Sequence, residues 1–477
     1  MLDEKFKKYL DEAYKGLYDE TEEGATLPNF EIIDRTVEIN TTADPAKKIE
    51  QFARICYRSE DRITDSSAKG LLDFCMKHDH GSIFEHFFIS VFFPNEGNFA
   101  EVMGDEHLTP RRVWDACMCT TRNKHMFQYW DKWIQVNPNI PLAENMHWAT
   151  TAGAVRAWRG ILVPGIEASI KQDIYPALVL HLALLKKLNE FAPALFHDIV
   201  EWVDVTLSNV SMLGGCKSLV KLTDGLDKEE ISLDGIPANR LDIGLVLHEA
   251  EGAYASFVLV TDRADSHQIV RHRVECGYSQ ESQRYCDYER KGVAMVTPQI
   301  EPAILAKMDE ETIQKLATDI AKAMENAACS YNSLRFMGLI PESARAVLPN
   351  SCATKIGVSM SFVALEHFFN RRLAKDAQYS LRVTAAEMLK QLIDTQHPVM
   401  HNLSAHSLLR WCKWLIEQKC VIGGMEYWTE VITKTNEALE QLKAERKRQA
   451  EQAAAVEQQA EELRKEQLAK EAAEKKQ

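Results

Sequence analysis

The chain has 477 residues, of which 45% are hydrophobic and 26% charged, and its formal net charge is −14. This length and hydrophobic content allow two globular domains. The acidic balance argues against a protein that wraps nucleic acid, although a small anion could still bind in a local basic pocket. No stretch approaches the roughly 20 apolar residues of a membrane span, and the charged N-terminus does not resemble a signal peptide. We therefore expect a cytoplasmic protein that binds neither nucleic acid nor membrane.

The eleven cysteines are scattered singly, and without a secretory signal we expect them to be reduced thiols. The nearest approach to a metal-binding cluster is Cys117 and Cys119 with His125. Their spacing matches no familiar zinc pattern. We therefore expect small buried side chains there and no metal site.

Taken in chain order, composition divides the sequence into five segments. A mixed, partly helical N-terminal extension covers residues 1–45, and a first folded region covers 46–213. Polar residues with Gly and Asp predict a linker or exposed loop at 214–239. A second folded region covers 240–430, and the tail at 431–477 becomes almost purely Ala, Glu, Lys, Gln and Arg. Because the apolar stripe of the tail is sparse, we expect a solvated helix or weak coiled coil outside the main fold.

The two folded regions follow the same pattern of predicted elements. Each passes from a helix through a strand-like run and then becomes mainly helical. Late in each region, one helix is followed by an amphipathic helix that stops near a proline. The spacing from Arg156 to Pro193 is close to that from Val363 to Pro398, which suggests a duplicated domain. The strand-like runs are residues 87–93 and 255–260.

The most informative motif lies in the second region. Three adjacent side chains, Arg271 to Arg273, are followed after eight residues by Ser282 and then Arg284. A planar guanidinium suits a phosphate group, and a serine hydroxyl adds neutral donors to the same oxygens. The motif therefore predicts a phosphate site with a second anion nearby. The alternative is a solvated basic strand end that pairs with local acids such as Glu275 and Glu281.

The first region carries three histidines within nine residues, His78, His80 and His86. They could be metal ligands or part of a capped helix end. His78 and His80 are only two residues apart, unlike the i, i+4 pairs of helical zinc sites, so we do not expect a metal. Ser82, which precedes an apolar run, could merely cap a helix.

These motifs resemble those of the flavin-dependent thymidylate synthases. The Arg-His-Arg segment with its Ser-x-Arg end is similar to the family signature, and Gln268 also matches it. The segment from Glu342 to Pro349 is similar to the family's E-x-x-R-x-x-L-P element, and counting on without a gap places Arg372 at the arginine that holds the uracil ring. Gln280 stands where the family more often has Glu. The substrate-binding residues that the resemblance implies are Gln268, Gln280, Ser282, Gln283, Arg284, Arg345 and Arg372, and we expect Ser282 and Arg372 to be catalytic.

The first region resembles the parts of the family that contact the flavin. Residues 53–57 are similar to its A-R-x-[SC]-[FY] element, residues 80–86 to its H-x-x-x-F-E-H element, and Arg156 to the arginine of its N-A-R-A-W-R element. The cofactor-binding residues implied by the resemblance are Cys56, His80, Ser82, Glu85, Arg156, Arg271, His272 and Arg273.

Each region lacks what the other keeps. The first has no Arg-His-Arg segment, and its corresponding part is different and expanded at 104–145. The second has His248 to Ala253 in place of H-x-x-x-F-E-H, and Val363 where the first has Arg156. Family members are homotetramers whose sites assemble from several subunits. We therefore expect a homodimer that forms a pseudo-tetramer with two competent sites.

For the fold, the resemblance implies an α+β class: two tandem copies of a small antiparallel sheet flanked by long helices, plus a charged helical tail. It implies reductive methylation of dUMP to dTMP, with methylenetetrahydrofolate as carbon donor and FAD and NADPH for the redox step. Three alternatives remain: transfer of another one-carbon unit such as hydroxymethyl to the same nucleotide, a nucleotide-binding regulator without activity, and a metal-dependent hydrolase built on the histidines.

Overall fold

The computed structural model describes residues 2–19, 30–93, 127–129, 149–213, 216–226 and 231–474. The chain forms two compact units. The first comprises Met1–Arg372 and Ala377–Leu403, and the second comprises Leu373–Asp376 and Ser404–Gln477. Among the described residues, no helix is long and apolar enough to cross a membrane.

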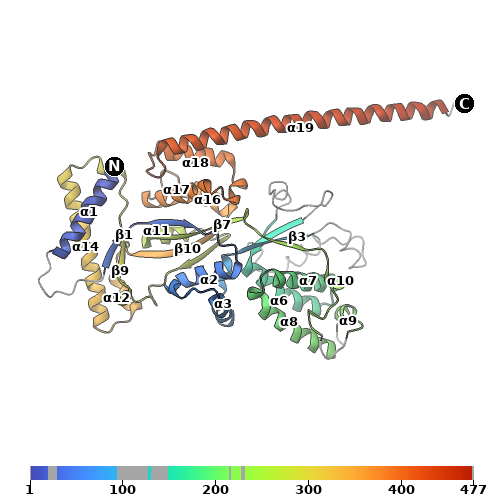
Figure 1. Ribbon diagram of the computed structural model, residues 1–477, viewed down its shortest axis with the longest axis horizontal. Helices are drawn as coiled ribbons and strands as arrows, with labels where there is room; N and C mark the ends of the chain where they lie inside the picture. The colour runs from blue at the N-terminus through green and yellow to red at the C-terminus, as the bar shows by residue number, and fades with distance from the viewer. Residues whose placement is uncertain are drawn as a thin grey trace. The chain divides into compact units, whose positions relative to one another are not determined.

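The first unit contains all ten described strands and most of the helices (Figure 1). The strands are β1 (Phe30–Ile33), β2 (Thr36–Ile39), β3 (Phe88–Phe93), β4 (Phe127–Tyr129), β5 (Ala149–Ala154), β6 (Val246–Glu249), β7 (Tyr254–Asp262), β8 (Cys276–Gln280), β9 (Val293–Val296) and β10 (Ala353–Ser361). The longer helices are α1 (Leu2–Asp19), α2 (Pro45–Ile55), α3 (Ser67–Lys77), α6 (Val155–Lys171), α7 (Tyr175–Phe191), α8 (Pro193–Leu213), α14 (Glu310–Phe336), α16 (Phe362–Arg372) and α17 (Tyr379–Asp394). The shorter ones are α9 (Lys217–Thr223), α10 (Ala238–Leu241), α11 (Arg263–Ile269), α12 (Tyr288–Lys291), α13 (Pro302–Leu305) and α15 (Pro341–Ala344), with 3-10 turns η1 (Glu60–Arg62), η2 (Gly81–Glu85), η5 (Arg345–Val347) and η6 (Pro398–His401).

The described strands form three sheets. One four-stranded antiparallel sheet has the order β2-β7-β10-β8, and a second has the order β4-β5-β3-β6. The strands β1 and β9 form a two-stranded parallel sheet. Small antiparallel sheets together with long helices confirm the expected α+β class.

The strand β7 is central to its sheet and positions the helix that carries Gln268. It lies between β2 and β10 and is buried along nearly its whole length, which explains the continuous apolar run in its sequence. At its end, the Asp262 side chain accepts a hydrogen bond from the backbone N–H of Asp265 at 2.7 Å and so caps α11. The strand and the helix are therefore joined without a loop.

Two pairs of antiparallel strands in the first unit share the same register. β5 ends at Ala154 opposite Phe88, the first residue of β3. In the same way, β10 ends at Ser361 opposite Tyr254, the first residue of β7. In both pairs the second strand runs directly into a helix, α6 or α16, and a further helix, α7 or α17, packs against it.

The helix after each strand pair begins in the same way. The first backbone N–H of α6 donates to the carbonyl of Phe87 at 2.9 Å, and the first N–H of α16 donates to the carbonyl of Ala253 at 2.8 Å. Arg156 and Val363 are therefore both the second residue of equivalent helices. The predicted sequence correspondence between them has a matching geometry.

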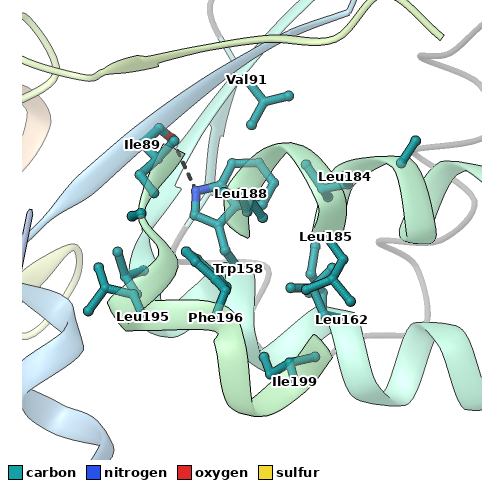
Figure 2. Close-up of a cluster of buried hydrophobic side chains, with 14 of the residues drawn as sticks. Ile89, Val91, Trp158, Leu162, Leu184, Leu185, Leu188, Leu195, Phe196 and Ile199 are labelled. Carbon is teal, nitrogen blue, oxygen red and sulfur yellow. Dashed lines mark hydrogen bonds between the residues drawn. The ribbon is translucent and has the colours of Figure 1, made fainter. Parts of the chain in front are cut away.

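A large apolar core lies between β3, β5 and the helices α6 to α8 (Figure 2). Trp158 is fully buried, and its indole Nε1 donates to the carbonyls of Ile89 and Gly153 at 3.1 and 3.0 Å. The indole thus joins α6 to both strands while its ring packs in the core. The labelled residues around it are Val91, Leu162, Leu184, Leu185, Leu188, Leu195, Phe196 and Ile199.

The stretch 214–239, expected as a linker or exposed loop, is largely packed where it is described. α9 contacts α7 and α8, and its Leu219 and Leu222 are buried. Ile231, Leu233 and Ile236 are buried as well. This stretch is polar on average, so its composition did not indicate burial. A few apolar residues in it nevertheless reach the core, and they determine how it packs.

Some expectations fall on residues outside the described part of the chain. They include the expanded segment 104–145, of which only β4 is described, and the group Cys117, Cys119 and His125.

The second unit consists of α18 (Ala405–Glu417) and α19 (Gly424–Glu474). Trp411 on α18 and Trp428 on α19 are fully buried. Beyond Glu437 the described side chains are mostly exposed, and Leu442 is 46% exposed. The tail is therefore helical, as its composition predicts.

Candidate active site

The Arg-His-Arg segment lies between α11 and β8. Arg271 and Arg273 are exposed, whereas His272 is buried. In the described part of the chain neither arginine has an acidic partner. Two unpaired guanidinium groups make this surface locally positive in an otherwise acidic chain, and such a surface suits an anionic ligand.

The acids that could have neutralised this segment are engaged elsewhere. Glu275 accepts a hydrogen bond from the hydroxyl of Ser361. Glu281 is buried and accepts one from the hydroxyl of Tyr288 at 2.6 Å. The alternative of a basic strand end paired with these two acids is therefore not what the structure shows.

His272 is held between Arg372 and a second histidine. Its Nε2 accepts from Arg372 Nε at 3.0 Å, and its Nδ1 lies 3.2 Å from Nδ1 of His367. Burial, together with the positive charge of Arg372, lowers the pKa of His272 to about 4. The ring is therefore neutral at pH 7, with its proton on Nδ1 because Nε2 is an acceptor.

Arg372, the last residue of α16, is fixed on three sides. Besides the bond to His272, its Nη1 donates to the side-chain oxygen of Gln268 at 3.0 Å and its Nη2 donates to the backbone carbonyl of Gln268 at 2.9 Å. A guanidinium has five N–H donors, so two remain, one on each terminal nitrogen. Arg372 therefore presents two oriented charged donors to a ligand.

The Ser-x-Arg loop follows β8 and rests on the first region. The backbone N–H of Ser282 donates to the carbonyl of Cys56 at 3.0 Å, which connects the loop to the end of α2. Ser282 and Arg284 reach the surface. The Gln283 side chain is buried and donates to Cys352 Sγ at 3.4 Å, so only its backbone N–H could reach a ligand.

One residue, Glu342, brings two of the expected substrate-binding arginines together. Glu342 accepts from Arg284 Nε at 3.0 Å, and its backbone carbonyl accepts from Arg345 Nε at 3.2 Å. Arg284 and Glu342 are 51% and 44% exposed at their side chains, so this ion pair is weak in water. An anionic ligand could therefore replace Glu342 as the partner of the two arginines at a small cost in free energy.

Gln280 is the last residue of β8. Its side-chain amide donates to Ser266 Oγ at 3.0 Å and to Thr354 Oγ1 at 3.1 Å. Ser266 lies on α11, the helix that also carries Gln268. Gln280 therefore holds α11 against β10.

The flavin-type elements of the first region lie beside β8. η2 packs against this strand so closely that a Cβ on Gly277 would lie 2.8 Å from the backbone oxygen of Glu85. Glu85 forms an ion pair with Arg156 from α6. His80 and Ser82 are exposed at the same turn. The H-x-x-x-F-E-H element, Arg156 and the strand after the Arg-His-Arg segment are thus neighbours.

Neither of two pockets in the described part of the chain is formed by the expected site residues. One, of about 600 Å³, is lined by residues including Arg58, Glu281, Tyr288 and Lys355. The other, of about 220 Å³, is lined by residues including Lys48, Glu249 and Tyr254.

The expected residues form separate groups. In the first group, Arg372 is hydrogen-bonded to Gln268 and His272. In the second, Glu342 binds both Arg284 and Arg345. In the third, η2 packs against β8. No group of three His, Cys, Asp or Glu side chains among the described residues is placed to hold a metal ion.

Sequence reasoning missed three residues that hold these groups in place. They are His367 beside His272, Gln378 beside Gln268, and Asp265, which accepts from Gln378. His367 had no spacing signal that connected it to His272. Gln378 and Asp265 had none, because a hydrogen-bond chain between distant segments leaves no spacing pattern.

Comparison with known proteins agrees with these observations. The family model described as thymidylate synthase complementing protein matches residues 39–93 and 248–399. The flavin-dependent thymidylate synthase of Geobacter sulfurreducens is 36% identical over 171 residues, which cover 35% of this chain and 69% of that protein. The enzyme of the same name from Pyrococcus abyssi is 30% identical over 201 residues, which cover 41% of this chain and 75% of that protein. The chain therefore belongs to the flavin-dependent thymidylate synthase family.

A solved structure of a UMP/dUMP methylase from Streptomyces cacaoi is also similar over part of the chain. It is 22% identical, covers 31% of this chain and 69% of its own, and has a TM-score of 0.26. At that TM-score the similarity supports no statement about the site.

Proposed function

We propose that this chain methylates dUMP reductively to dTMP, with methylenetetrahydrofolate as carbon donor, FAD as cofactor and NADPH as reductant. The observation that carries the proposal is Arg372, which is fixed by Gln268 and a neutral His272 and keeps two donors for a ligand. Such a guanidinium is suited to pyrimidine oxygens on which negative charge develops during the reaction. Arg372 would stabilise that charge, and Gln268 would lie beside the nucleoside.

The phosphate of dUMP would bind at the Ser-x-Arg loop. Ser282 would donate through its hydroxyl, and Arg284 and Arg345 would turn from Glu342 to the phosphate oxygens. Gln283 would contribute its backbone N–H, and Gln280 would keep α11 in place. Because Arg372 and this loop form separate groups, one nucleotide would bridge them or take the two groups from different chains.

The chain's residues fit a flavin. Arg271 and Arg273 are exposed and, in the described part of the chain, without acidic partners, as a pyrophosphate requires. Bound FAD would accept hydride from NADPH and deliver it to the pyrimidine. Arg271, His272 and Arg273 would hold the cofactor together with Cys56, His80, Ser82, Glu85 and Arg156. His272 would act as a neutral hydrogen-bonding group, because its pKa is about 4.

We further propose that the chain carries a duplicated family fold, with copies in 46–213 and 240–430 and residues 1–45, 214–239 and 431–477 outside them. The equal registers of β3–β5 and β7–β10, and the equivalent starts of α6 and α16, support the duplication. Arg156 would supply the flavin contact that Val363 cannot make. Two chains would form the pseudo-tetramer in the cytoplasm, with two complete sites.

Flavin binding by full-length variants tests this proposal. We expect the purified chain to bind FAD, and Arg271→Ala and Arg273→Ala each to weaken FAD binding about tenfold or more, because a charge-assisted bond is lost. Arg290→Ala is the matched control: Arg290 is similarly exposed, but it pairs with Asp287 in α12. Fluorescence quenching of FAD measures the affinities. Equal affinities in all four proteins would contradict the assignment of the cofactor site.

A further inference from the structure

Arg372 stands at one end of a hydrogen-bond chain that begins at a buried ion pair. Asp265 is fully buried, and Arg35 pairs with it and with Asp262. Asp265 Oδ1 accepts from Gln378 Nε2 at 3.2 Å and from Ser380 Oγ at 2.7 Å. The carboxylate therefore faces the start of α17 with two hydrogen bonds and is held in place by Arg35 behind it.

The chain continues through two side-chain amides to the arginine. Gln268 Nε2 donates to Gln378 Oε1 at 2.5 Å, and Arg372 Nη1 donates to Gln268 Oε1 at 3.0 Å. Two parts of the chain that lie far apart in sequence meet here: α11, and the connection from the end of α16 to the start of α17.

The two ends of this chain fix the direction of both amides. An ionised carboxylate can only accept, so Gln378 must turn its NH₂ group toward Asp265 and its oxygen toward Gln268. Gln268 must then turn its NH₂ group toward Gln378, which leaves its oxygen for Arg372. A guanidinium can only donate hydrogen bonds, so within the Gln268 side chain Arg372 can bond only to the amide oxygen. Every donor therefore meets an acceptor in one orientation only.

We propose that Asp265 and Gln378 are positioning residues that orient Gln268 and Arg372 for the pyrimidine ring of the substrate. This inference rests on the proposed function, in which those two side chains bind dUMP. Asp265 and Gln378 act through other residues and do not touch the nucleotide. The buried ion pair with Arg35 supplies the fixed end, and the exposed end of the chain meets the ligand.

The geometry accounts for the division of roles along the chain. Asp265 is buried, whereas Gln378 is exposed and Gln268 and Arg372 are half-buried. Gln378 therefore contributes little to the core, and its hydrogen bonds chiefly set direction. Substitution of Gln378 should reduce substrate affinity while leaving the stability of the fold nearly unchanged.

Two variants of one residue separate direction from packing. Gln378→Glu keeps the shape and still offers an acceptor to Gln268, but it replaces the donor to Asp265 with a carboxylate oxygen, so two carboxylates repel each other and the fixed end of the chain is lost. Gln378→Met keeps the length and removes both hydrogen bonds. Gln391→Met is the matched control in α17, the helix that Gln378 precedes. Gln391 accepts from the backbone N–H of Ile39 at 2.9 Å and donates to the carbonyl of Val37, so its bonds go to β2 and not to Gln268 or Asp265.

The measurement is dUMP binding to the full chain saturated with FAD, by calorimetry, together with the melting temperature of each variant. We expect both Gln378 variants to bind dUMP about tenfold or more weakly at a nearly unchanged melting temperature. Gln391→Met should lower the melting temperature and bind dUMP within twofold of the unsubstituted chain.

Two outcomes would overturn the inference, and they are distinguishable. If both Gln378 variants bind dUMP within twofold while Arg372→Ala loses binding, the positioning role is wrong and the proposed function stands. If the unsubstituted chain does not bind dUMP, the proposed function fails and this inference fails with it. Loss of binding that follows loss of melting temperature across all three variants would likewise overturn it, because it would show a purely structural effect.

Discussion

The imidazole ring of His86 connects α2 with the strands β8 and β10. The imidazole is buried and stacks on Phe52 with ring centroids 4.1 Å apart. Its two nitrogens each lie 2.9 Å from a serine hydroxyl, Ser359 on β10 and Ser279 on β8. Burial lowers the pKa of His86 to about 3. His86, one of the three histidines considered above as metal ligands, is therefore a neutral structural contact.

The lowered pKa predicts how stability depends on pH. The unfolded chain binds a proton at His86 near pH 6.5, whereas the folded chain does so only near 3, so the free energy of unfolding falls as pH falls below about 6.5. From pH 7.5 to 5, His86 alone should cost about 2 kcal/mol. His181, His272 and His397, each with a pKa lowered to about 4, act in the same direction.

The variant His86→Phe isolates this contribution. It keeps the stacking but leaves two buried hydroxyls without the ring nitrogens, at a cost of about 1–3 kcal/mol at neutral pH. Urea unfolding at pH 7.5 and pH 5 should show a loss with acid that is about 2 kcal/mol smaller than in the unsubstituted chain. An equal loss in both proteins would mean that His86 already titrates normally in the fold.

For single residues, the sequence predicts where charged side chains gather better than it predicts their hydrogen-bond partners. The sequence predicts the cluster of cations at Arg271 and Arg273, but only the structure shows that, among the described residues, the nearby acids Glu275 and Glu281 bond elsewhere. The motif places Gln283 beside Ser282 and Arg284, but it does not give the direction of the Gln283 side chain, which donates to Cys352 Sγ. Hydrogen-bond chains such as that from Asp265 to Arg372 depend on the meeting of distant parts of the chain and could not be predicted.

Among the elements, the contact between η2 and β8 is the one that unites the motifs of the two regions. Gly277 allows it, because any Cβ there would meet the backbone of Glu85 at 2.8 Å. Backbone cannot move aside as the end of a flexible side chain can. The strand and the flavin-type turn are therefore in contact only as long as residue 277 is glycine.

The variant Gly277→Ala should push η2 away from β8. We expect FAD to bind about tenfold more weakly, because His80, Ser82 and Glu85 move together with the turn. FAD titration and thermal unfolding measure the two effects.

Gly70→Ala in α3 is the control for this substitution. A Cβ there meets nothing within 4 Å. In a helix this change should stabilise the chain by up to about 1 kcal/mol and leave the FAD affinity unchanged. If Gly277→Ala bound FAD as tightly as the control, η2 would not belong to the cofactor site.

For the whole molecule, the sequence predicts the order of elements well and their packing less well. The strand-like runs expected at 87–93 and 255–260 appear as β3 and β7, and the late helix pairs appear as α6 with α7 and α16 with α17, since period and proline positions encode them locally. The strands β5 and β10, which lead into those helix pairs, were not predicted. The packing of 214–239 was not predicted, because burial of Leu219 and Leu222 depends on the distant helices α7 and α8. The family model matches only residues 39–93 and 248–399. The proposal that residues 149–213 belong to a copy of the fold therefore rests on the geometry of their strands and helices alone.

Release of tritium from dUMP labelled at C5 of the pyrimidine tests the central claim most directly. The full chain would be assayed with FAD, NADPH and methylenetetrahydrofolate, and with each omitted in turn. We expect release that requires both FAD and NADPH, and dTMP as the product when methylenetetrahydrofolate is present. A folded chain that binds dUMP but releases no tritium, or releases it without flavin, would contradict the account.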